Sequence, residues 1–313
     1  MVQARQGRVQ SCDNRPEHGG SHRREKKRPD GFRTNEDMGI RRWFGRGKVR
    51  PGEQDHSLEL SRLDGRVMLG VTCLGKRDGG GAQVHAVMSA MLFARAMGVP
   101  YFHTPFAAVM HGADPAAFAV RWEGAFNLGG GAARIPRRMP VITGEAACRG
   151  YRGPPAVVAQ QHFHAFADSR PDLYACIVDD LRRRLTLPSR SSAAPTIAVH
   201  VRRGDVVGKL PYAKRFTDNA TLARHIGAAL RDFPGHRVRI FSQGAEADFG
   251  GLPDVCEFEL DADIFATLSG LIEADCLIMA KSSLSYVAGL YSRGTVYYEP
   301  FWHRPLSSWR ILD

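Results

Sequence analysis

Two adjacent arginines follow a short apolar stretch in the second half of the chain. The segment TIAVHV (196–201) leads directly into Arg202 and Arg203, and Asp205 lies two positions further on. A planar guanidinium matches two phosphate oxygens at once, so an arginine pair at the end of a strand is suited to hold a diphosphate. The alternative from the same residues is a structural ion pair between one arginine and Asp205.

Two other apolar segments also end in hydroxyl-bearing residues. RVRIFS (237–242) ends at Ser242, and CLIMA (276–280) is followed by Ser282 and Ser283. The two later serines fall at the start of an expected helix, where unpaired backbone N–H groups and the helix dipole form an anion site. The alternatives are an ordinary polar turn at Ser242 and simple helix capping at the later pair.

A glycine-rich segment in the first half of the chain, KRDGGGAQ (76–83), is another candidate ligand-binding loop. Gly79 and Gly81 match the first two positions of a dinucleotide fingerprint, but Val84 occupies the third. NAD or FAD binding is therefore poorly supported, and the sequence has no P-loop pattern. We expect the loop to bring backbone N–H groups and Gln83 toward a ligand; the alternative is a tight strand–helix turn.

Two residue pairs have spacings that also occur in metal sites. Asp261 and Asp263 form a DxD pattern, which chance alone produces about once in a chain of this composition. His162 and His164 form an HxH pair, and the sequence offers no third ligand beside it. We therefore expect no bound metal. The pattern HxRRxD at 200–205, by contrast, arises by chance only about 0.01 times per chain.

The elements around these residues alternate between strands and helices. After a linker-like segment at 185–195, apolar strand candidates alternate with helix candidates as far as residue 299. Such alternation indicates a parallel sheet covered on both faces. Before the linker, a strand candidate at 66–73 and an amphipathic helix from Val84 indicate a second unit, and 128–160 is interpreted as irregular. In parallel sheets, ligands bind beyond the carboxyl ends of the strands, where the candidate residues fall.

The chain is expected to contain a basic segment followed by two lobes. Residues 1–60 are polar and without periodicity, and we expect them to be disordered; 61–190 then form the first lobe and 191–313 the second. Most of the net charge of +11 lies in the first 50 residues, which argues against nucleic-acid binding by a structured basic face. A weak, salt-sensitive contact of the basic segment with RNA or anionic lipid stays open.

Composition favours a cytoplasmic globular protein. The sequence has no stretch of about 18 apolar residues and no apolar signal-peptide core at its start, so we expect neither a membrane span nor secretion. The six cysteines have no CxxC spacing, and several lie in apolar stretches. This distribution is typical of free thiols in a cytoplasmic protein.

The segment from His200 to Asp205 resembles the HxRRxD motif of GDP-fucose-dependent fucosyltransferases, the α1,2-, α1,6- and protein O-fucosyltransferase superfamily. GGGAQVH (79–85) is similar to the family's early GGxGNQxF loop, although Ala82 departs from it, and AKSSLSYVAGL (280–290) resembles its late NSSFSxxAxxL segment. The resemblance implies a GT-B-like fold, in which two Rossmann-like lobes with parallel sheets face a cleft. It also implies an inverting mechanism without a metal or other cofactor.

Carried over residue by residue, the resemblance implies roles for the strand-end groups. Arg202 would hold the β-phosphate of GDP-fucose, and Arg203 would support the nucleotide or the loop. Ser283 and its helix N-terminus would share the diphosphate. An acid of the Asp261–Asp263 pair would accept guanine N–H groups.

At the head of the motif, His200 is expected to be a structural hydrogen-bonding group. Asp205 and His85 are the two candidate bases toward the acceptor hydroxyl; the alternative is a loose, oxocarbenium-like transition state that needs no dedicated base. The expected function is transfer of fucose from GDP-fucose to a glycan or another hydroxyl acceptor. The alternatives are another nucleotide-sugar donor, because the arginines bind diphosphate and not the sugar ring, and a non-catalytic nucleotide- or glycan-binding protein of the same fold.

Overall fold

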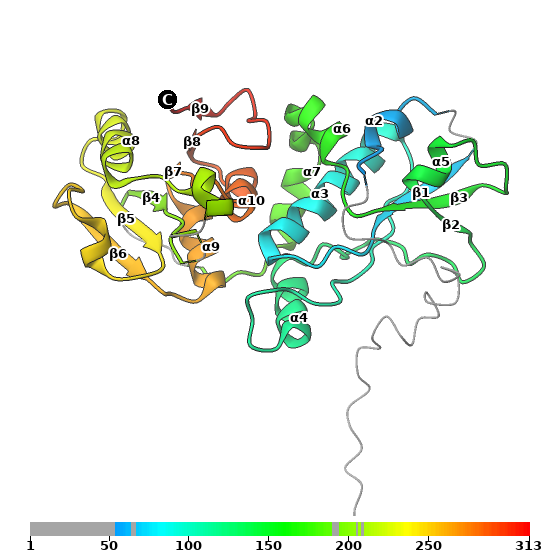
Figure 1. Ribbon diagram of the computed structural model, residues 1–313, viewed down its shortest axis with the longest axis horizontal. Helices are drawn as coiled ribbons and strands as arrows, with labels where there is room; N and C mark the ends of the chain where they lie inside the picture. Colours follow the sequence, from blue (N-terminus) through cyan, green and yellow to red (C-terminus); the bar gives the residue numbers. More distant parts are fainter. Residues whose placement is uncertain (1–53, 64–66, 190–193, 205, 208–209) are drawn as a thin grey trace, which may run out of the picture.

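Two α/β units make up the described part of the chain (Figure 1). The computed structural model describes residues 54–63, 67–189, 194–204, 206–207 and 210–313. Among these residues, one unit contains a three-stranded sheet and the other a six-stranded sheet, and the paired strands in both are parallel. The prediction of two α/β lobes with parallel sheets is therefore confirmed.

The second lobe carries the larger sheet, with the strand order β6-β5-β4-β7-β8-β9. Its strands are β4 (Thr196–His200), β5 (Arg237–Ser242), β6 (Cys256–Leu260), β7 (Cys276–Ile278), β8 (Thr295–Tyr298) and β9 (Arg310–Ile311). Its helices are α8 (Asn219–Asp232), α9 (Ile264–Glu273) and α10 (Ser283–Tyr291), with short 3₁₀ helices at Leu210–Arg215 and Glu246–Phe249.

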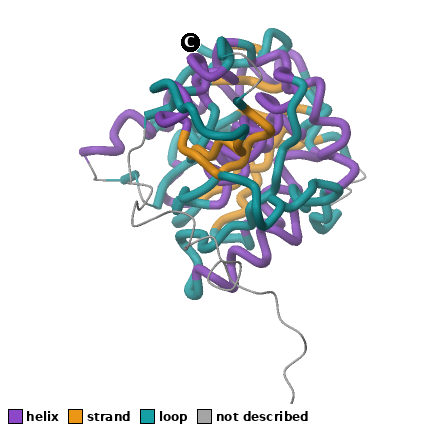
Figure 2. The backbone as a smooth tube through the Cα atoms, turned by 90° about the vertical axis from the view of Figure 1, so that its right-hand side faces the viewer, coloured by secondary structure: helices purple, strands orange, loops and turns teal. Residues whose placement is uncertain are grey.

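Alternate residues of β4 face opposite sides of this sheet. Ile197 and Val199 share a core with Leu222 and Ile226 of α8, whereas Ala198 lies in the core beneath α9 and α10. This two-residue alternation is what a strand covered on both faces requires. Figure 2 shows the strands enclosed by helices and loops.

The first lobe carries the smaller sheet, with the order β1-β3-β2. Its strands are β1 (Met68–Cys73), β2 (Val141–Thr143) and β3 (Ala156–Gln160). Its helices are α2 (Ser57–Leu60), α3 (Gly80–Met97), α4 (Pro115–Phe126), α5 (Gly144–Cys148), α6 (His164–Ser169) and α7 (Ala175–Arg184), the last preceded by a 3₁₀ turn at Pro171–Tyr174.

The region 128–160 differs from the sequence-based interpretation as irregular. It contains β2, α5 and β3, and β3 is the central strand of the first sheet. The five residues of β3, AVVAQ, are all buried. Their run is too short to show a period, and glycines and prolines surround it, so sequence periodicity does not reveal the strand.

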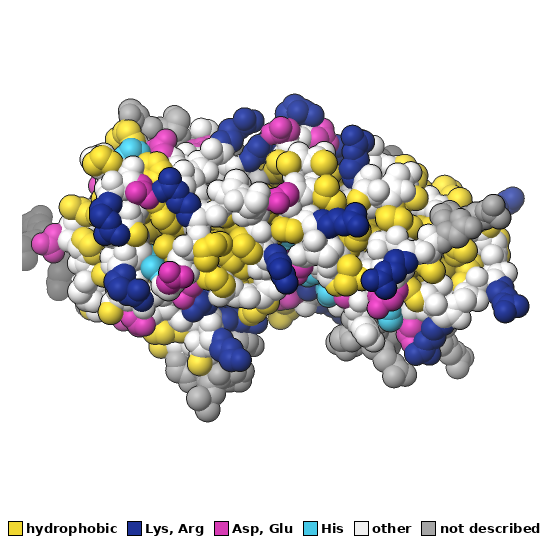
Figure 3. All heavy atoms as spheres, turned by 90° about the horizontal axis from the view of Figure 1, so that it is seen from above, with side chains coloured by type: hydrophobic (Ala, Val, Ile, Leu, Met, Phe, Trp, Pro, Cys, Tyr) yellow, Lys and Arg dark blue, Asp and Glu magenta, His cyan; other side chains and the backbone are white. Residues whose placement is uncertain are grey.

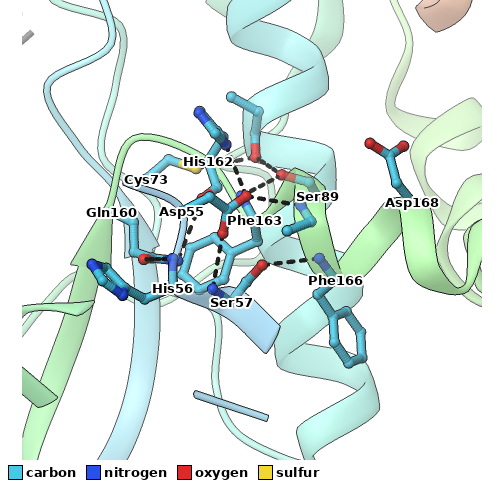
Figure 4. A network of polar contacts seen from close by, with 12 residues as sticks. Asp55, His56, Ser57, Cys73, Ser89, Gln160, His162, Phe163, Phe166 and Asp168 are labelled. Atoms are coloured by element: carbon cyan, nitrogen blue, oxygen red, sulfur yellow. Dashed lines mark hydrogen bonds and ion pairs between the residues drawn. The ribbon is translucent and has the colours of Figure 1, made fainter. Parts of the chain in front are cut away.

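Residues 54–60 belong to the first lobe, although the sequence-based boundary placed them in the disordered segment (Figure 4). The Asp55 carboxylate accepts hydrogen bonds from the backbone N–H of Ala165 at 2.8 Å and lies 3.1 Å from Nδ1 of His162. The Ser57 hydroxyl accepts from the backbone N–H of Phe166 at 2.9 Å. These contacts hold α2 against the loop before α6. Residues 1–53 lie outside the described ranges.

The two lobes share one hydrophobic core. The side chains beneath α9 and α10 form a single cluster with those of α3, α4 and α7. Arg182 of α7 adds a polar link, because its Nε donates to the carbonyl of Tyr291 at 2.8 Å, at the end of α10. Helix C-termini leave such carbonyls without intrahelical partners. The lobes are thus packed together through helices rather than connected only by their linker.

Basic and acidic side chains are intermixed on the surface of the folded part of the chain that Figure 3 shows. On the face shown in Figure 3, lysine and arginine side chains are spread from one end of the molecule to the other, with acidic side chains among them.

Within the described ranges, every helix is too short or too polar to cross a bilayer. The described cysteines are all free thiols.

Candidate functional site

The winding of the second sheet reverses between β4 and β7. From β4 the chain proceeds outward to β5 and β6, and then returns to place β7 on the other side of β4. In open parallel sheets the crevice for a ligand lies beyond the carboxyl ends of the strands at this reversal. His200 ends β4 and Arg202 follows it, and Ser282 and Ser283 follow β7. Both groups of predicted residues therefore flank the switch point.

His200 closes the switch point with a hydrogen bond. Its Nδ1 is bonded to Oγ of Ser285 in α10, and the same oxygen accepts the backbone N–H of Ala280 at 3.1 Å. Burial, and then the positive charge of Arg202, lower the pKa of His200 to about 4. The imidazole is neutral at physiological pH and ties β4 to α10, which agrees with the expected structural role.

Arg203 has a different task from Arg202. Its side chain is only 5% exposed, and it donates to the carbonyl of Thr217 at 3.0 Å and to Oδ1 of Asn219 at 2.7 Å. The guanidinium also lies 4.5 Å from the ring centroid of Phe216. Arg203 therefore holds the loop that connects β4 to α8. Arg202 is partly exposed at the end of β4, where it is closer to solvent than its neighbour.

A second polar chain fixes this loop to the end of β8. The Thr217 hydroxyl donates to Oε2 of Glu299 at 2.7 Å, and Nζ of Lys281 lies 2.6 Å from Oε1 of the same carboxylate. Lys281 directly precedes the predicted serines. The sequence analysis did not single out Lys281 or Glu299; their positions at the carboxyl ends of two expected strands are the signal that could have identified them.

The N-terminus of α10 is formed by the two predicted serines. The Ser282 hydroxyl accepts from the backbone N–H of Leu284 at 3.2 Å, which makes Ser282 the N-cap. Ser283 is the first helical residue and is partly exposed. Among the described residues, its hydroxyl has no hydrogen-bond partner. Capping thus occupies Ser282, while Ser283 and the helix terminus are available to an anion.

The glycine loop of the first lobe lies directly against this helix terminus. A Cβ on Gly81 would come within 2.7 Å of Cα of Leu284, and one on Gly80 would come within 2.0 Å of the Trp122 ring. Both positions therefore require glycine for close packing rather than for an unusual backbone angle. Gly79 is the N-cap of α3 and is partly exposed.

Gln83 supports the loop and does not reach toward a ligand. Its side chain is 2% exposed, and its Nε2 donates to the carbonyls of Asp78 and Ala108, both at 2.8 Å. His85, a candidate base, is 1% exposed and hydrogen-bonded through Nε2 to the hydroxyl of Tyr174 at 2.9 Å. Such burial does not favour contact with an acceptor hydroxyl. Asp205, the other candidate base, lies outside the described residues.

The predicted acids both follow β6, which lies two strands away from β4 in the sheet. Asp263 caps α9 by accepting from the backbone N–H of Phe265 at 3.0 Å, and it pairs with Arg121 of α4 at 2.9 Å. Burial acts to raise the pKa of Asp263, but the hydrogen bond from Arg121 and those of the helix cap outweigh it and lower the pKa. Its carboxylate is therefore already occupied by protein donors. Asp261 is exposed in a left-handed backbone conformation.

Ser242 and its neighbour Gln243 lie beside the arginine loop at the end of β5. Ser242 is partly buried and donates to the carbonyl of Gln243 at 3.2 Å. A Cβ on Gly204 would lie 2.1 Å from Oε1 of Gln243. The loops after β4 and β5 therefore touch, and Ser242 forms a polar turn at one side of the switch point.

We define the switch-point site as Arg202, Ser283, the α10 N-terminus and the Gly79–Gly81 loop. No protein-family profile and no curated protein sequence matches the chain. Among solved structures, it is similar to NodZ from Bradyrhizobium, with 13% identity and a TM-score of 0.39 over 71% of this chain and 93% of that chain. It is also similar to a mutant of Arabidopsis thaliana FUT1 in complex with GDP, with 12% identity and a TM-score of 0.38 over 88% of this chain and 78% of that chain. NodZ is a fucosyltransferase. Neither likeness is close enough to assign an activity to this chain.

Proposed function

We propose that the protein is a glycosyltransferase that binds a nucleoside diphosphate sugar at the switch-point site and uses GDP-fucose as its donor. The observation that supports this function is the placement of Arg202 and the α10 N-terminus on the two sides of one switch point. A guanidinium and a helix N-terminus are two of the groups that proteins use to bind phosphates. The choice of GDP and fucose rests on the resemblance of residues 200–205 to the HxRRxD motif.

The proposed reaction is an inverting transfer. The acceptor oxygen forms a bond to C1 of fucose from the face opposite the diphosphate. The bond between C1 and the β-phosphate oxygen breaks, and its electron pair stays on GDP. The hydroxyl proton passes to a base or to water. The charge on GDP increases as this bond breaks, so preorganised donors at the diphosphate lower the barrier.

In this proposal Arg202, Ser283 and the α10 N-terminus stabilise the leaving diphosphate without a divalent ion. One unit charge about 4 Å from a phosphate in partly screened surroundings contributes up to ~4 kcal/mol of gross interaction energy. The glycine loop lies beside the helix terminus, where its backbone can approach the same ligand. Arg203, His200 and the pair of Lys281 with Glu299 keep the loop and the helix in position.

Nucleotide titration on the full chain tests the donor. We expect GDP to bind more tightly than UDP or AMP by calorimetry, and we expect GDP-fucose to release GDP in the presence of hydroxyl acceptors. If GDP binds no better than the other two nucleotides, the GDP-fucose proposal is wrong. Tight GDP binding without turnover of any acceptor would instead favour the non-catalytic nucleotide-binding alternative.

Replacement of the exposed arginine tests the site. Arg202→Ala should lower turnover by about 10²–10³-fold, because it removes one donor to the leaving group. Arg231→Ala, on the exposed end of α8, is the matched control and should leave turnover unchanged. Thermal unfolding of both variants shows whether the fold is retained. Unchanged turnover in a folded Arg202→Ala protein would contradict the proposed role.

A further inference from the structure

Three histidines that are far apart in the sequence lie together where the lobes meet. His85 belongs to α3 and His164 to the start of α6, whereas His303 follows β8 in the second lobe. One ring nitrogen from each residue lies within 4.8 Å of the corresponding atoms of the other two. His164 of the HxH pair thus gains two partners that the sequence spacing did not reveal.

Two of the three rings are oriented by a second hydrogen-bonding group. Nε2 of His85 is bonded to the Tyr174 hydroxyl at 2.9 Å, and Nδ1 of His303 lies 3.3 Å from Oδ2 of Asp168. Metal-binding histidines are typically held in this way, with one nitrogen on the metal and the other on a carboxylate or another polar partner. The second carboxylate oxygen of Asp168 accepts the backbone N–H of Arg304 at 3.2 Å, so it is itself fixed.

Among the described residues, one ring nitrogen of His85 and one of His164 have no hydrogen-bond partner. Nδ1 of His85 and Nε2 of His164 are buried and form no hydrogen bond. An unsatisfied buried polar atom costs about 1–3 kcal/mol, and two of them in adjacent rings need an explanation. The rings of His85 and His164 are stacked with centroids 4.4 Å apart, and His303 meets both edge-on at 4.3 and 4.7 Å. Aromatic packing explains the proximity of the rings but not the two unpaired nitrogens.

We propose that His85, His164 and His303 bind a divalent transition-metal ion, of which Zn²⁺ is the best chemical match. Imidazole nitrogens suit Zn²⁺ at about 2.0–2.1 Å, and three histidines are an established ligand set for it. Nitrogens at that distance from one tetrahedral ion lie about 3.3 Å from each other. The rings would therefore have to move closer together than their present spacing of up to 4.8 Å.

The ion would link the two lobes. Two ligands come from the first lobe, and the third comes from the segment after β8. That segment already contacts the first lobe, because Ser307 donates to Asp172 at 2.7 Å. His85 lies about 6 Å along the axis of α3 from Gly81, so the ion would lie behind the switch-point site without belonging to it. The proposal does not depend on the proposed sugar transfer, for which no metal is expected.

Metal stoichiometry on the full chain tests the proposal. The protein used in this experiment is the full chain with the substitutions His18→Asn and His22→Asn. These two histidines, which lie outside the described ranges, then cannot contribute to metal binding. After chelation, reloading with Zn²⁺ and dialysis to remove the excess, we expect one equivalent of Zn²⁺ per chain by elemental analysis. We also expect a Co²⁺ visible spectrum typical of low coordination number. Zn²⁺ at about 100 times its Kd should stabilise the protein by ~2.7 kcal/mol, visible as a higher Tm.

Substitutions then locate the ion. His164→Phe and His303→Phe keep an aromatic ring in the cluster and should each abolish the stoichiometric binding and the Co²⁺ spectrum. Asp168→Asn should weaken binding by about 10–100-fold, since it removes only the group that orients His303. His162→Phe is the matched control, because His162 stacks on His164 but bonds to Asp55. Circular dichroism identifies any variant that fails to fold.

Two results would overturn the proposal. One is the absence of stoichiometric Zn²⁺ and Co²⁺ binding by the folded parent chain. The other is unchanged affinity in folded His164→Phe and His303→Phe proteins. Asp168→Asn keeps the test decisive if both ring substitutions prevent folding, because an unchanged Kd in that variant would also contradict the assigned ligand set.

Discussion

At the scale of single residues, the two adjacent arginines divide into a buried and a partly exposed member. The Arg203 guanidinium donates to Thr217 and Asn219, while Arg202 lies nearer the surface of the switch point. The sequence shows that two arginines at the end of an apolar strand are unusual, and only the resemblance to the HxRRxD motif implies different roles for Arg202 and Arg203. Only the contacts of the β4–α8 loop show which of them supports the protein.

Arg203→Lys should destabilise the protein by about 1–3 kcal/mol. A lysine has one nitrogen at its end and cannot replace a planar group that donates to two separate acceptors, so buried oxygens are left unsatisfied. The free energy of unfolding from urea titration measures this effect. Arg231→Lys on the exposed surface is the control and should change that free energy by less than about 0.5 kcal/mol. Equal stability of the two variants would show that the contacts of Arg203 are dispensable.

His200 should make folding stability depend on pH between about 4 and 6.5. In this range the unfolded chain binds a proton at His200 and the folded protein does not, because burial lowers the folded pKa to about 4. Stability is therefore full above pH ~6.5 and falls as the pH is lowered, by on the order of 3 kcal/mol for this group.

Comparison of wild type with His200→Gln isolates this contribution. In the variant, the unfolding free energy should change less steeply with pH over that range, by the contribution of about one bound proton. Denaturant unfolding in the presence of a chelator measures this slope. Parallel stability–pH curves for the two proteins would mean that His200 titrates normally.

At the scale of secondary-structure elements, the contact between α3 and α10 forms the switch-point site. A side chain at Gly81 would clash with α10, because its Cβ would lie only 2.7 Å from Cα of Leu284. The helix N-terminus and the glycine loop are therefore held at a distance set by backbone atoms. Both segments were singled out from the sequence, but their packing against each other was not.

Gly81→Ala should separate these two elements. The added methyl group meets backbone atoms that cannot move aside independently, so we expect a loss of about 1–3 kcal/mol in stability and weaker GDP binding. Gly124→Ala in α4 is a matched control, because nothing lies within 4 Å of its Cβ position. That control should be neutral or stabilising by up to about 1 kcal/mol. Unfolding free energies and calorimetric Kd values compare the two.

The sequence predicted elements unevenly across the two lobes. Strands β4 and β5 and helix α8 have residue patterns long enough to show their periods, and Asp218 caps α8. Strand β3 was missed because five buried residues between glycines and prolines show no period. Residue type after a strand led to Arg202, Ser282 and Ser283 as candidates. The tertiary contacts that occupy Gln83 and Asp263, and the pairing of Lys281 with Glu299, were not anticipated from the sequence.

At the scale of the whole molecule, the two lobes should unfold together. A single hydrophobic cluster runs from α9 and α10 into α3, α4 and α7, so each lobe shares a large part of its core with the other. We expect one calorimetric transition whose calorimetric and van't Hoff enthalpies agree. Near-ultraviolet and far-ultraviolet circular dichroism should give the same Tm. Two separate transitions would show that the shared core is too weak to couple the lobes.

The packing of Gly81 against Leu284 also determines when during synthesis the site can form. The glycine loop leaves the ribosome early, whereas α10 follows after about 200 more residues, which takes roughly 10–40 s at ordinary rates of translation. During that interval the nascent chain carries a glycine loop without the helix terminus that completes it. If the site binds a nucleotide as proposed, that ligand can stabilise only a chain that has been synthesised through α10, and it cannot act as a template for the early steps of folding.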